Sequence, residues 1–415
     1  MEFRKKEKKH ILVFSQHFWP EEFRVNDVCR GLVEQGYDVD VICGIPNYPD
    51  GKVYKSWGFF KRTKENWNGI NIRRVWEIPR GKKNSMFRIL LNFVSWPFFC
   101  MFYLPFIGKK YDRVLMYQLS PVIMSFPAIV YRAFTKIPLT IYILDYWPFS
   151  VFAVMNIKSN FVKHMITKLS RWHYRKADGI IAVFEGMLSM LINDVKIDSS
   201  KIIYIPQACE KLHEEKLFDE SIQEKYKNKF CIVFTGSINP AQSFDIVIQA
   251  AKICFNEGLT NIHWVIVGDG MSRNDVEEMV EKNGLKNNFH FEGYHPVTDM
   301  PKYYAIADAF IVALKKSELG SFGIPAKIQS YFAAGKPIIG AMDGDAAMMI
   351  NDNHVGLCGP SDSIETLSKN IRDIYMLTED ERIAMGERAK KYYYEHFERN
   401  EQLKKLINFM FREEG

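Results

Sequence analysis

The sequence predicts an α/β fold of two tandem, doubly wound, Rossmann-like domains. The chain of 415 residues is longer than a single ordinary core, apolar strands alternate with helical stretches, and this alternation stops at a polar linker and then restarts. Near-continuous β-branched runs between helices are typical of parallel sheets covered on both faces. We expect one domain over residues 1–207, a second over 208–388, and a C-terminal helix over 389–415.

The first half opens with a strand at residues 10–18, followed by a helix at 26–36 that ends at Gly36. The remaining apolar runs of this half predict further strands, with helical stretches before those that begin at 111, 139 and 179. These strands are expected at residues 37–44, 111–118, 139–146, 179–184 and 201–207. The polar residues 210–229 then form the expected linker.

The second half repeats the pattern, with a short helix that begins near Pro325. Ile328 and Phe332 of this helix recur at the spacing of a buried face, and Gly335 marks its C-terminal end. From Thr378 onward the chain is charged and helical. The strands of this half are expected at residues 230–237, 262–270, 289–294, 307–314 and 337–342.

The net charge of +6 hides a difference between the two halves. Residues 1–205 carry 31 Lys+Arg and 17 Asp+Glu, a net charge of +14, whereas residues 206–415 carry 24 and 32, a net charge of −8. The first half is therefore expected to face an anionic partner. Because no nucleic-acid motif is visible, we expect an anionic membrane surface rather than a nucleic acid.

The cysteines and the N-terminus indicate a cytoplasmic protein. The seven cysteines are odd in number and form no C-x-x-C pair, which indicates reduced thiols. The N-terminus is basic but lacks an apolar segment long enough for a signal peptide.

Residues 89–107 form an uncharged, aromatic-rich stretch of 19 residues. Three interpretations stay open: a helix buried in the first domain, a hydrophobic surface that rests in the inner leaflet with a basic rim, and a membrane span. Prolines within the stretch and its place inside the first sheet disfavour a span. The flanking basic residues are Lys82, Lys83, Arg88, Lys109, Lys110 and Arg113.

Glycine-rich loops follow several strands of the second half, where ligands lie in doubly wound sheets. Helices that begin near Ser243 and Pro325 would aim N–H groups at an anion, and Lys327 adds a positive charge. For each glycine alone, ordinary turn geometry explains the residue equally well. Together the loops predict a site for a phosphorylated ligand, with candidate residues Gly236, Gly268, Asp269 and Gly323.

Other common sites are excluded by their motifs. The sequence lacks G-x-G-x-x-G after its candidate first strands, a Walker lysine, H-E-x-x-H and G-x-S-x-G. The D-x-D at Asp38–Asp40 lies inside a strand, and Asp343 and Asp345 fit the cap of a following helix better than a sugar contact. We therefore expect no metal and no cofactor.

In the first half, polar residues follow two strands and are candidate site residues. The loop that begins at residue 16 holds His17, Glu21, Glu22 and Arg24, and a later loop begins with Asp145. Arg24 and Asp145 are the stronger candidates, because burial in a loop would otherwise leave their charges unpaired. A structural role explains His17 equally well. These side chains are expected to face the second domain across a cleft.

Several segments together resemble the family-4 retaining glycosyltransferases of GT-B fold, closest to the branch of L-fucosamine-type transferases of O-antigen and capsule assembly. These segments cover nearly the whole chain in the right order. They are "FWPEEFRVNDVCRGLVEQGYDVDVICGIPNYPDGK", "DYWP", "ADGIIAVFEGM", "KIIYIP", "VGDG", "FEGYHPVTDMPKYYAIADAFIV" and "PAKIQSYFAAGKPII".

The resemblance implies an acceptor-binding first domain, a nucleotide-sugar-binding second domain, a last helix that returns to the first domain, and metal-independent transfer. The positions of the family's two glutamates are Phe322 and Ser330 here. Ser330 is then the expected ribose contact. Gln242 and Lys327 replace the family's basic donors to the diphosphate, and with Asp145 they are the expected catalytic residues. His17, Glu22 and Arg24 are the expected acceptor contacts.

The favoured hypothesis is a membrane-associated transferase that moves a sugar, such as an N-acetylated deoxyamino sugar, from a UDP-linked donor to a polyprenyl-linked or surface-polysaccharide acceptor. A nucleotide-sugar epimerase would need neither the basic first half nor the apolar stretch. A non-catalytic scaffold subunit that binds a sugar nucleotide stays open, because the glutamate pair is missing.

Overall fold

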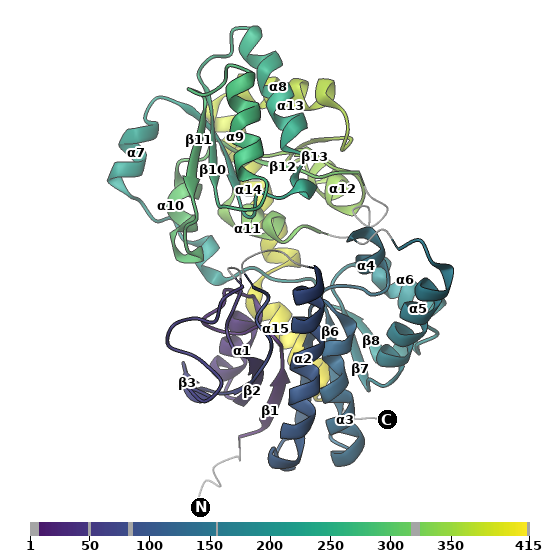
Figure 1. The fold of residues 1–415 in the computed structure, drawn as a ribbon. Helices are drawn as coiled ribbons and strands as arrows, with labels where there is room; N and C mark the ends of the chain where they lie inside the picture. The colour runs from purple at the N-terminus through teal and green to yellow at the C-terminus, as the bar shows by residue number, and fades with distance from the viewer. Residues whose placement is uncertain (1–7, 49–50, 82–85, 155–156, 317–323, 413–415) are drawn as a thin grey trace, which may run out of the picture. The chain divides into compact units, whose positions relative to one another are not determined.

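The computed structural model describes residues 8–48, 51–81, 86–154, 157–316 and 324–412. The chain folds into two compact units. The first consists of Met1–Pro206 and Asn400–Gly415, and the second of Gln207–Arg399. Each unit is built around one sheet with helices on both faces (Figure 1).

Among the described residues, the sheet of the first unit has eight strands in the order β3-β4-β2-β1-β5-β6-β7-β8. Only the edge strand β3 runs antiparallel to its neighbour. The carboxyl ends of the other strands therefore meet at one edge of the sheet. The strands are β1 (His10–Phe14), β2 (Asp38–Gly44), β3 (Lys64–Trp67), β4 (Ile70–Val75), β5 (Arg113–Gln118), β6 (Leu139–Ile143), β7 (Gly179–Ala182) and β8 (Ile202–Tyr204).

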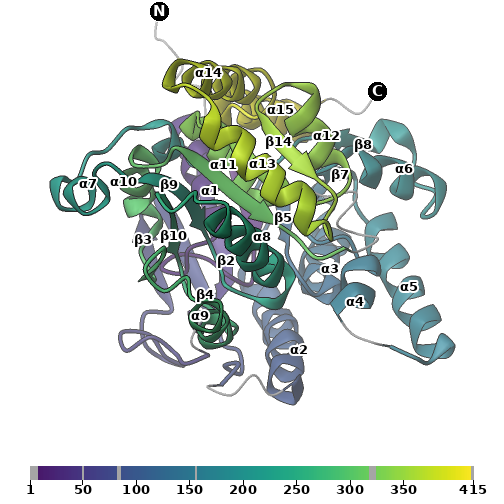
Figure 2. The same cartoon turned by 90° about the horizontal axis from the view of Figure 1, so that it is seen from above.

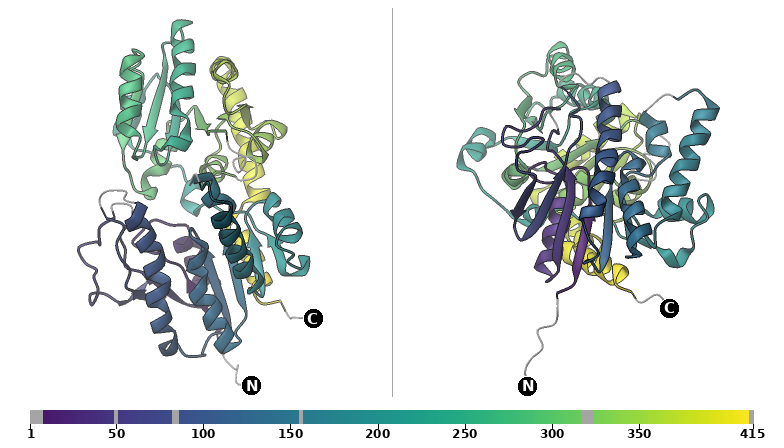
Figure 3. Two further views of the ribbon diagram at one scale, coloured as in Figure 1. Left: turned by 45° about the vertical axis from the view of Figure 1, so that its right-hand side comes forward. Right: turned by 60° about the horizontal axis from the view of Figure 1, so that its bottom comes forward.

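Helices cover this sheet on both faces (Figure 1, Figure 3). The core of one face contains Trp96, Ala128 and Tyr174, from α2, α3 and α5, and the core of the other face contains Leu32 of α1 and Leu406 of α15. The helices are α1 (Val25–Glu34), α2 (Met86–Tyr103), α3 (Phe126–Thr135), α4 (Phe149–Val154), α5 (Asn160–Arg175), α6 (Glu185–Asn193) and α15 (Arg399–Met410), with 3₁₀ turns η1 (Leu104–Phe106), η2 (Val122–Ser125) and η3 (Ser199–Lys201).

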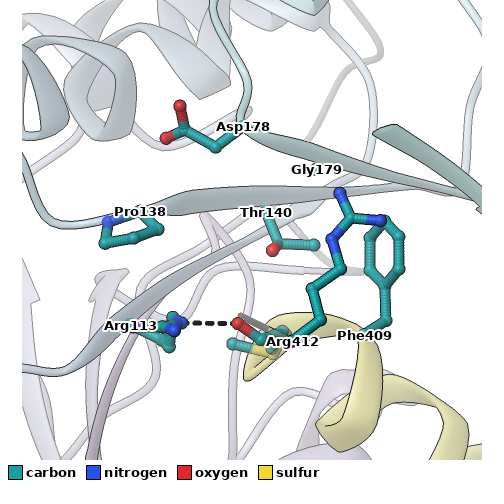
Figure 4. A pocket seen from close by; sticks show the side chains of 8 residues that line it. Arg113, Pro138, Thr140, Asp178, Gly179, Phe409 and Arg412 are labelled. Atoms are coloured by element: carbon teal, nitrogen blue, oxygen red, sulfur yellow. Dashed lines mark hydrogen bonds between the residues drawn. The ribbon is translucent and has the colours of Figure 1, made fainter. Parts of the chain in front are cut away.

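The end of α15 is fixed at the edge of the first sheet where β5, β6 and β7 begin. A cavity of about 100 Å³ lies there, and Figure 4 shows Phe409 and Arg412 beside Thr140 and Gly179. The guanidinium of Arg113 donates to the carbonyl oxygen of Met410. This cavity lies at the opposite edge from the carboxyl ends of the strands, so we assign it to the anchoring of α15.

In the described part of the second unit, six parallel strands form a sheet in the order β11-β10-β9-β12-β13-β14. Each neighbouring pair is joined in parallel register, as between β9 and β10. The strands are β9 (Phe230–Thr235), β10 (Ile262–Val267), β11 (Phe289–Gly293), β12 (Ala309–Ala313), β13 (Ile338–Ala341) and β14 (Gly356–Gly359).

Two buried layers cover the two faces of the second sheet. One layer includes Val247, Val276 and Ile371 from α8, α9 and α13, and α8 and α13 lie side by side in Figure 2. The other includes Tyr331 of α11 and Tyr393 of α14. The helices are α7 (Glu220–Tyr226), α8 (Phe244–Asn256), α9 (Arg273–Lys282), α10 (Met300–Ala305), α11 (Ala326–Ala334), α12 (Asp345–Asp352), α13 (Ile364–Met376) and α14 (Glu379–His396), with 3₁₀ turns η4 (Lys211–Glu214), η5 (Pro240–Gln242) and η6 (Val297–Asp299).

The structure confirms the alternation of strands and helices and the predicted strands. Strands β2 and β5 end at the expected residues, Gly44 and Gln118, and the other predicted strands end earlier than expected. The structure differs at three places. Strands β3, β4 and β14 were not predicted, and the expected linker 210–229 contains η4 and α7. The expected last helix over 389–415 is interrupted, because α14 ends at His396 and α15 begins at Arg399.

Candidate functional site

Two glycines bring the loops after β9 and β10 of the second unit into close contact. Gly236 and Gly268 have φ values of +131° and +138°, which side chains disfavour. A Cβ atom on Gly268 would lie 2.0 Å from the carbonyl oxygen of Gly236. Only glycine therefore fits at position 268.

Lys327 places its ammonium group beside this glycine contact. Nζ lies 2.7 Å from Oε1 of Gln242 and 3.7 Å from the ring centroid of Phe234. A Cβ atom on Gly236 would be 3.5 Å from Nζ. Burial lowers the pKa of Lys327 to about 7, because the charged form loses its contact with water.

The start of α8 lies directly after Gln242. Ser243 has a left-handed conformation, with φ 34° and ψ 46°, and its side chain is 2% exposed. Its hydroxyl Oγ has no hydrogen-bond partner among the described residues. A helix start leaves N–H groups without a carbonyl of their own helix, so this end of α8 can bind an anion.

The other predicted site residues of the second unit differ in burial and in distance from Lys327. Ser330 is buried in α11, one turn beyond Lys327. Asp269 is exposed and holds its own loop, because Oδ1 accepts from the N–H of Gly270 at 2.7 Å. Gly323, like Phe322, lies outside the described residues. The structure thus brings Lys327, Gln242 and Gly236 together.

A basic residue that the sequence analysis did not single out lies at the start of α9. Arg273 follows β10, but its guanidinium already binds Glu277 at 2.7 Å and Asp269 at 3.5 Å. Asp343 is also engaged, since Oδ2 accepts from the hydroxyl of Ser361 at 2.7 Å. Lys327 is therefore better placed than Arg273 to neutralise a bound anion.

The first unit contains a buried polar network at the carboxyl ends of β1, β2 and β4. At its centre Glu77, 1% exposed, accepts from Nε2 of Gln16 at 2.7 Å and from Nδ2 of Asn47 at 2.5 Å. Burial, and then the negative charge of Glu21, raise the pKa of Glu77 to about 8. Glu77 therefore carries a proton at neutral pH for most of the time.

Glu21 joins this network to His17 and Arg80. Its Oε1 accepts from the N–H of Asn47 at 2.7 Å, and its Oε2 lies 2.8 Å from Nδ1 of His17. Nε2 of His17 lies 3.2 Å from Nη2 of Arg80. Because arginine only donates, Nε2 accepts and the hydrogen of His17 is on Nδ1. Among the described residues, no carboxylate lies within ion-pair distance of Arg80, whose guanidinium packs against the ring of Tyr48.

The structure favours the structural role of His17 over a direct acceptor contact. Both of its ring nitrogens are engaged, and its ring stacks on Phe23 with centroids 4.8 Å apart, so it is an interior member of the network. Glu22 is exposed, and Arg24 is the half-buried residue before α1. Asp145 follows β6, and β5 separates it from β1. Burial raises the pKa of Asp145, and hydrogen bonds to Ser120 partly offset this rise.

Sequence reasoning missed Glu77, Asn47 and Arg80. The reason is that β4 was not predicted, so residues 76–81 were not recognised as a loop at the carboxyl end of a strand. Asn47 lies in the loop after β2, which was predicted. A polar residue after each of three neighbouring strands is the signal that identifies the network once the strands are known.

Fold and comparison together define the class of the protein. A model described as glycosyl transferase 4-like domain matches residues 22–208, and one described as glycosyl transferases group 1 matches residues 215–392. The structure is similar to a glycosyltransferase from Rickettsia africae, with 17% identity, a TM-score of 0.70, and coverage of 97% of this chain and 98% of that one. It is also similar to Anabaena HepE in complex with UDP and glucose, with 13% identity, a TM-score of 0.67, and coverage of 96% and 97%. The protein is a glycosyltransferase of GT-B fold.

The sequence matches two curated bacterial proteins at low identity. One is the putative colanic acid biosynthesis glycosyl transferase WcaI of Escherichia coli (strain K12), 22% identical over 398 residues that cover 90% of this chain and 94% of the relative. The other is the probable glycosyltransferase WbjE of Pseudomonas aeruginosa, 23% identical over 70% of this chain and 73% of the relative. With the two matched models, these results place the chain in the group 1, GT4-like glycosyltransferases. They favour an enzyme over a scaffold subunit or an epimerase.

Proposed function

We propose that the protein moves a sugar from a UDP-linked donor to a lipid-linked or surface-polysaccharide acceptor at the inner face of the cell membrane, with retention of the anomeric configuration. The observation that carries this proposal is the position of Lys327 beside Gln242, Gly236 and the start of α8. The L-fucosamine-like donor suggested by the sequence remains part of the proposal.

The arrangement around Lys327 suits a leaving diphosphate. Negative charge builds on the diphosphate as the bond to the sugar breaks, and a preorganised cation with N–H donors stabilises that charge. Lys327 supplies the cation, and the start of α8 supplies N–H groups. In support, the relative WcaI is named for colanic acid biosynthesis, and HepE was solved with UDP and glucose.

For the acceptor we propose the carboxyl edge of the first sheet. The buried network holds Arg80 and Tyr48 at its outer side, where Tyr48 is 38% exposed. Glu22 and Arg24 lie in the neighbouring loop after β1. Protonated Glu77 adds no second negative charge beside Glu21, and Glu21 positions Arg80 through His17. We assign Glu77 and His17 positioning roles, and Asp145 a role at the carboxyl end of β6.

Helix α2 supports attachment to a membrane. Within the described residues, one helix, Phe87–Phe106, is long and apolar enough to cross a membrane, with a mean hydropathy of 1.6 and 33% of its apolar window buried. Its inner face packs Trp96 and Cys100 into the core of the first sheet, so we propose that it rests in the leaflet rather than spanning it. Its outward residues, the α2 stripe, are Phe87, Leu90, Val94, Phe98, Phe102 and Phe106, each 46–75% exposed.

A screen of nucleotide sugars for thermal stabilisation tests the donor. A ligand at 100 times its dissociation constant adds about 2.7 kcal/mol to the free energy of unfolding. We expect UDP and UDP-sugars to stabilise the protein, and Lys327→Ala to abolish most of that effect. Stabilisation by other nucleotides, with none by UDP, would contradict the proposed donor. Slow hydrolysis of the stabilising UDP-sugar by water, measured as UDP release without acceptor, then reports the activity of the donor site.

Lys327 also has a kinetic test. Removing one charge-assisted hydrogen bond of roughly 1.5–3 kcal/mol lowers donor affinity or rate by about 10- to 200-fold, so we expect that loss for Lys327→Ala. Ser330→Ala is expected to lose less, because a neutral hydroxyl contact contributes about 1 kcal/mol. Lys327→Arg is expected to restore only part of the rate. Rates of all three variants equal to the wild type would show that Lys327 does not contact the donor.

A further inference from the structure

Helix α5 of the first unit exposes an apolar stripe that is separate from α2. The stripe follows one face of the helix at steps of three and four residues. Leu169 and Trp172 are 40% and 39% exposed, whereas Ser170, His173 and Tyr174 face the core. We call the α5 stripe the residues Phe161, Val162, Met165, Leu169 and Trp172.

The same helix carries only positive charge. From Ile157 to Ala177 the sequence contains no Asp or Glu. Among the described residues, no carboxylate pairs with Lys168 or Arg171, whereas lysine and arginine on α9 pair with glutamates of their own helix. The basic residues of this segment are Lys158, Lys163, Lys168, Arg171, Arg175 and Lys176.

Helices α5, α3 and α2 belong to one layer on the same face of the first sheet (Figure 3). Both α2 and α5 contact the 3₁₀ turn η2. Between them, α3 exposes Phe134 at 74%, and its first residue Phe126 lies 6.2 Å from the ring of Trp172. The exposed apolar residues of the three helices thus belong to one layer of one unit.

We propose that α5 is a second docking helix for an anionic bilayer and supplies the salt-dependent part of membrane binding. An apolar stripe flanked by Lys and Arg, with a tryptophan in it, is the pattern of helices that lie in a membrane interface. This proposal rests on the proposed attachment of the first unit to the membrane. It assigns the apolar contact mainly to α2 and the electrostatic attraction mainly to α5.

The basic rim of α2 is a weaker source of electrostatic attraction. Nζ of Lys110 lies 3.1 Å from Oδ2 of Asp40, which already compensates its charge. Lys82 and Lys83 lie outside the described residues. Of the described basic residues of that rim, Arg88 and Lys109 are exposed and Arg113 donates to the carbonyl oxygen of Met410, whereas all six basic residues of the α5 segment are exposed. The α2 stripe therefore contributes apolar contact, and α5 contributes attraction to anionic lipid.

Vesicle flotation tests this division with three charge changes on α5. The variant Lys168→Gln, Arg171→Gln, Lys176→Gln is compared with the control Lys227→Gln, Lys369→Gln, Lys391→Gln, which removes the same charge from exposed positions of the second unit. Each Lys or Arg near an anionic leaflet contributes about a fivefold factor, so three changes should weaken binding by about 100-fold. We expect that loss on vesicles of phosphatidylcholine with phosphatidylglycerol, and none on phosphatidylcholine alone.

A second variant separates the apolar contact of α5 from that of α2. Met165→Ser with Leu169→Ser should lower binding to both kinds of vesicle, and Leu90→Ser with Phe98→Ser should do the same while leaving the salt dependence intact. Release of UDP from the donor without acceptor, measured in detergent, should be unchanged in every variant. That readout shows that each variant is folded, and it tests the donor site independently of the membrane.

Three results would overturn the proposal for α5. One is equal flotation of the wild type and the α5 charge variant, with the salt dependence preserved. Another is an equal loss in the control variant, which would assign the effect to net charge. The third is binding of the wild type to polyuridylate or to an acidic peptide, lost in the α5 variant, together with unchanged flotation. If neither the wild type nor any variant floats, the proposed attachment to membranes is wrong as well. Normal UDP release in the same proteins would still support the transferase activity.

Discussion

At the scale of single residues, the ammonium group of Lys327 is buried in largely apolar surroundings. Its ammonium lies against the Phe234 ring, and its hydrogen-bond partner among the described residues is the neutral oxygen Oε1 of Gln242. Burial lowers its pKa to about 7, so about half of the free protein carries the charge at pH 7. A bound diphosphate favours the charged form, and donor binding should therefore take up a proton.

We predict that the affinity for UDP falls as the pH rises through 7. The free protein loses the proton of Lys327 in that range, whereas the complex retains it, so binding at pH 7 takes up about half a proton. Calorimetry in buffers of different ionisation enthalpy measures this uptake. Lys327→Ala should bind UDP weakly and with no such dependence. The same proton uptake in that variant would assign the effect to another group.

Glu77 has the opposite kind of shift. Burial and the charge of Glu21 raise the pKa of Glu77 to about 8, while an unfolded glutamate titrates near its usual value, about 4.3. Between these two values the native state holds one proton more than the unfolded state. The free energy of unfolding therefore falls as pH rises in this window, by up to about 1.4 kcal/mol per pH unit, and the contribution is lost above pH 8.

We predict that Glu77→Gln flattens this dependence. Glutamine cannot release a proton, so the Tm of the variant relative to the wild type should rise steadily from pH 5 to pH 8. Scanning calorimetry at several pH values measures it. Exposed Glu185 of the same unit offers the control Glu185→Gln, which should shift Tm by the same amount at every pH. A constant difference for Glu77→Gln would show that Glu77 is ionised throughout.

At the scale of elements, the strands that were predicted are those with unbroken apolar runs, such as β9 and β12, because both of their faces are buried. The missed strands lack this signal. β3 is polar, β4 carries Arg73 and Arg74, and β14 is short and begins and ends with glycine. Missing β4 hid the loop that supplies Glu77 and Arg80, so the network depends on tertiary pairing that no local pattern shows.

The motif around Lys327 was predictable for a different reason. Lys327 lies in the first turn of α11, which begins after Pro325 as expected, and Gly335 ends this helix with a φ of +69°. The partner Gln242 was named from the resemblance, and the structure places it 2.7 Å from Lys327. The Ser243 hydroxyl, which has no hydrogen-bond partner within the described part of the chain, could be found only from the structure, since a left-handed residue at a helix start has no signature in the sequence.

We predict that Ser243→Gly stabilises the protein and weakens donor binding. Glycine adopts φ 34° without the cost of about 1–2 kcal/mol that a side chain meets there, and the change removes a buried hydroxyl that has no partner among the described residues. If the hydroxyl binds the donor, UDP affinity falls by about 5- to 10-fold, as for one neutral hydrogen bond. Thermal unfolding with and without UDP measures both effects.

Ser272→Gly is the matched control for this change. Ser272 precedes α9 as Ser243 precedes α8, but its φ of −97° suits any residue, so glycine should destabilise slightly there and leave UDP binding unchanged. A Ser243→Gly variant that is more stable and binds UDP as tightly as the wild type would show that the left-handed serine has no role in the site.

At the scale of the whole molecule, the two halves of the chain differ in net charge, +14 against −8, and each forms most of one unit. The basic half contains α2 and α5, and the acidic half contains Lys327 and its glycine loops. The chain leaves the first unit after Pro206 and returns to it at Asn400, so the first sheet is completed on one face by the last helix. The alternation of strands and helices predicted both sheets, whereas the side-chain network of the first had to be read from the structure.

We predict that transfer does not require a divalent metal ion. The carboxylates of the two closely spaced acidic pairs, at Asp38–Asp40 and Asp343–Asp345, are the ones that could bind it. Oδ2 of Asp40 is held by Tyr111 at 2.6 Å and Lys110 at 3.1 Å, and Asp343 binds Ser361 through both carboxylate oxygens. Both carboxylates already have protein partners, and Lys327 supplies the positive charge that a metal ion would bring to the diphosphate. We expect full activity in a chelator, measured as UDP release with acceptor, and no gain on adding Mg²⁺. Complete loss in the chelator, restored by Mg²⁺ and abolished by Asp343→Asn, would instead assign the loop after β13 to metal binding.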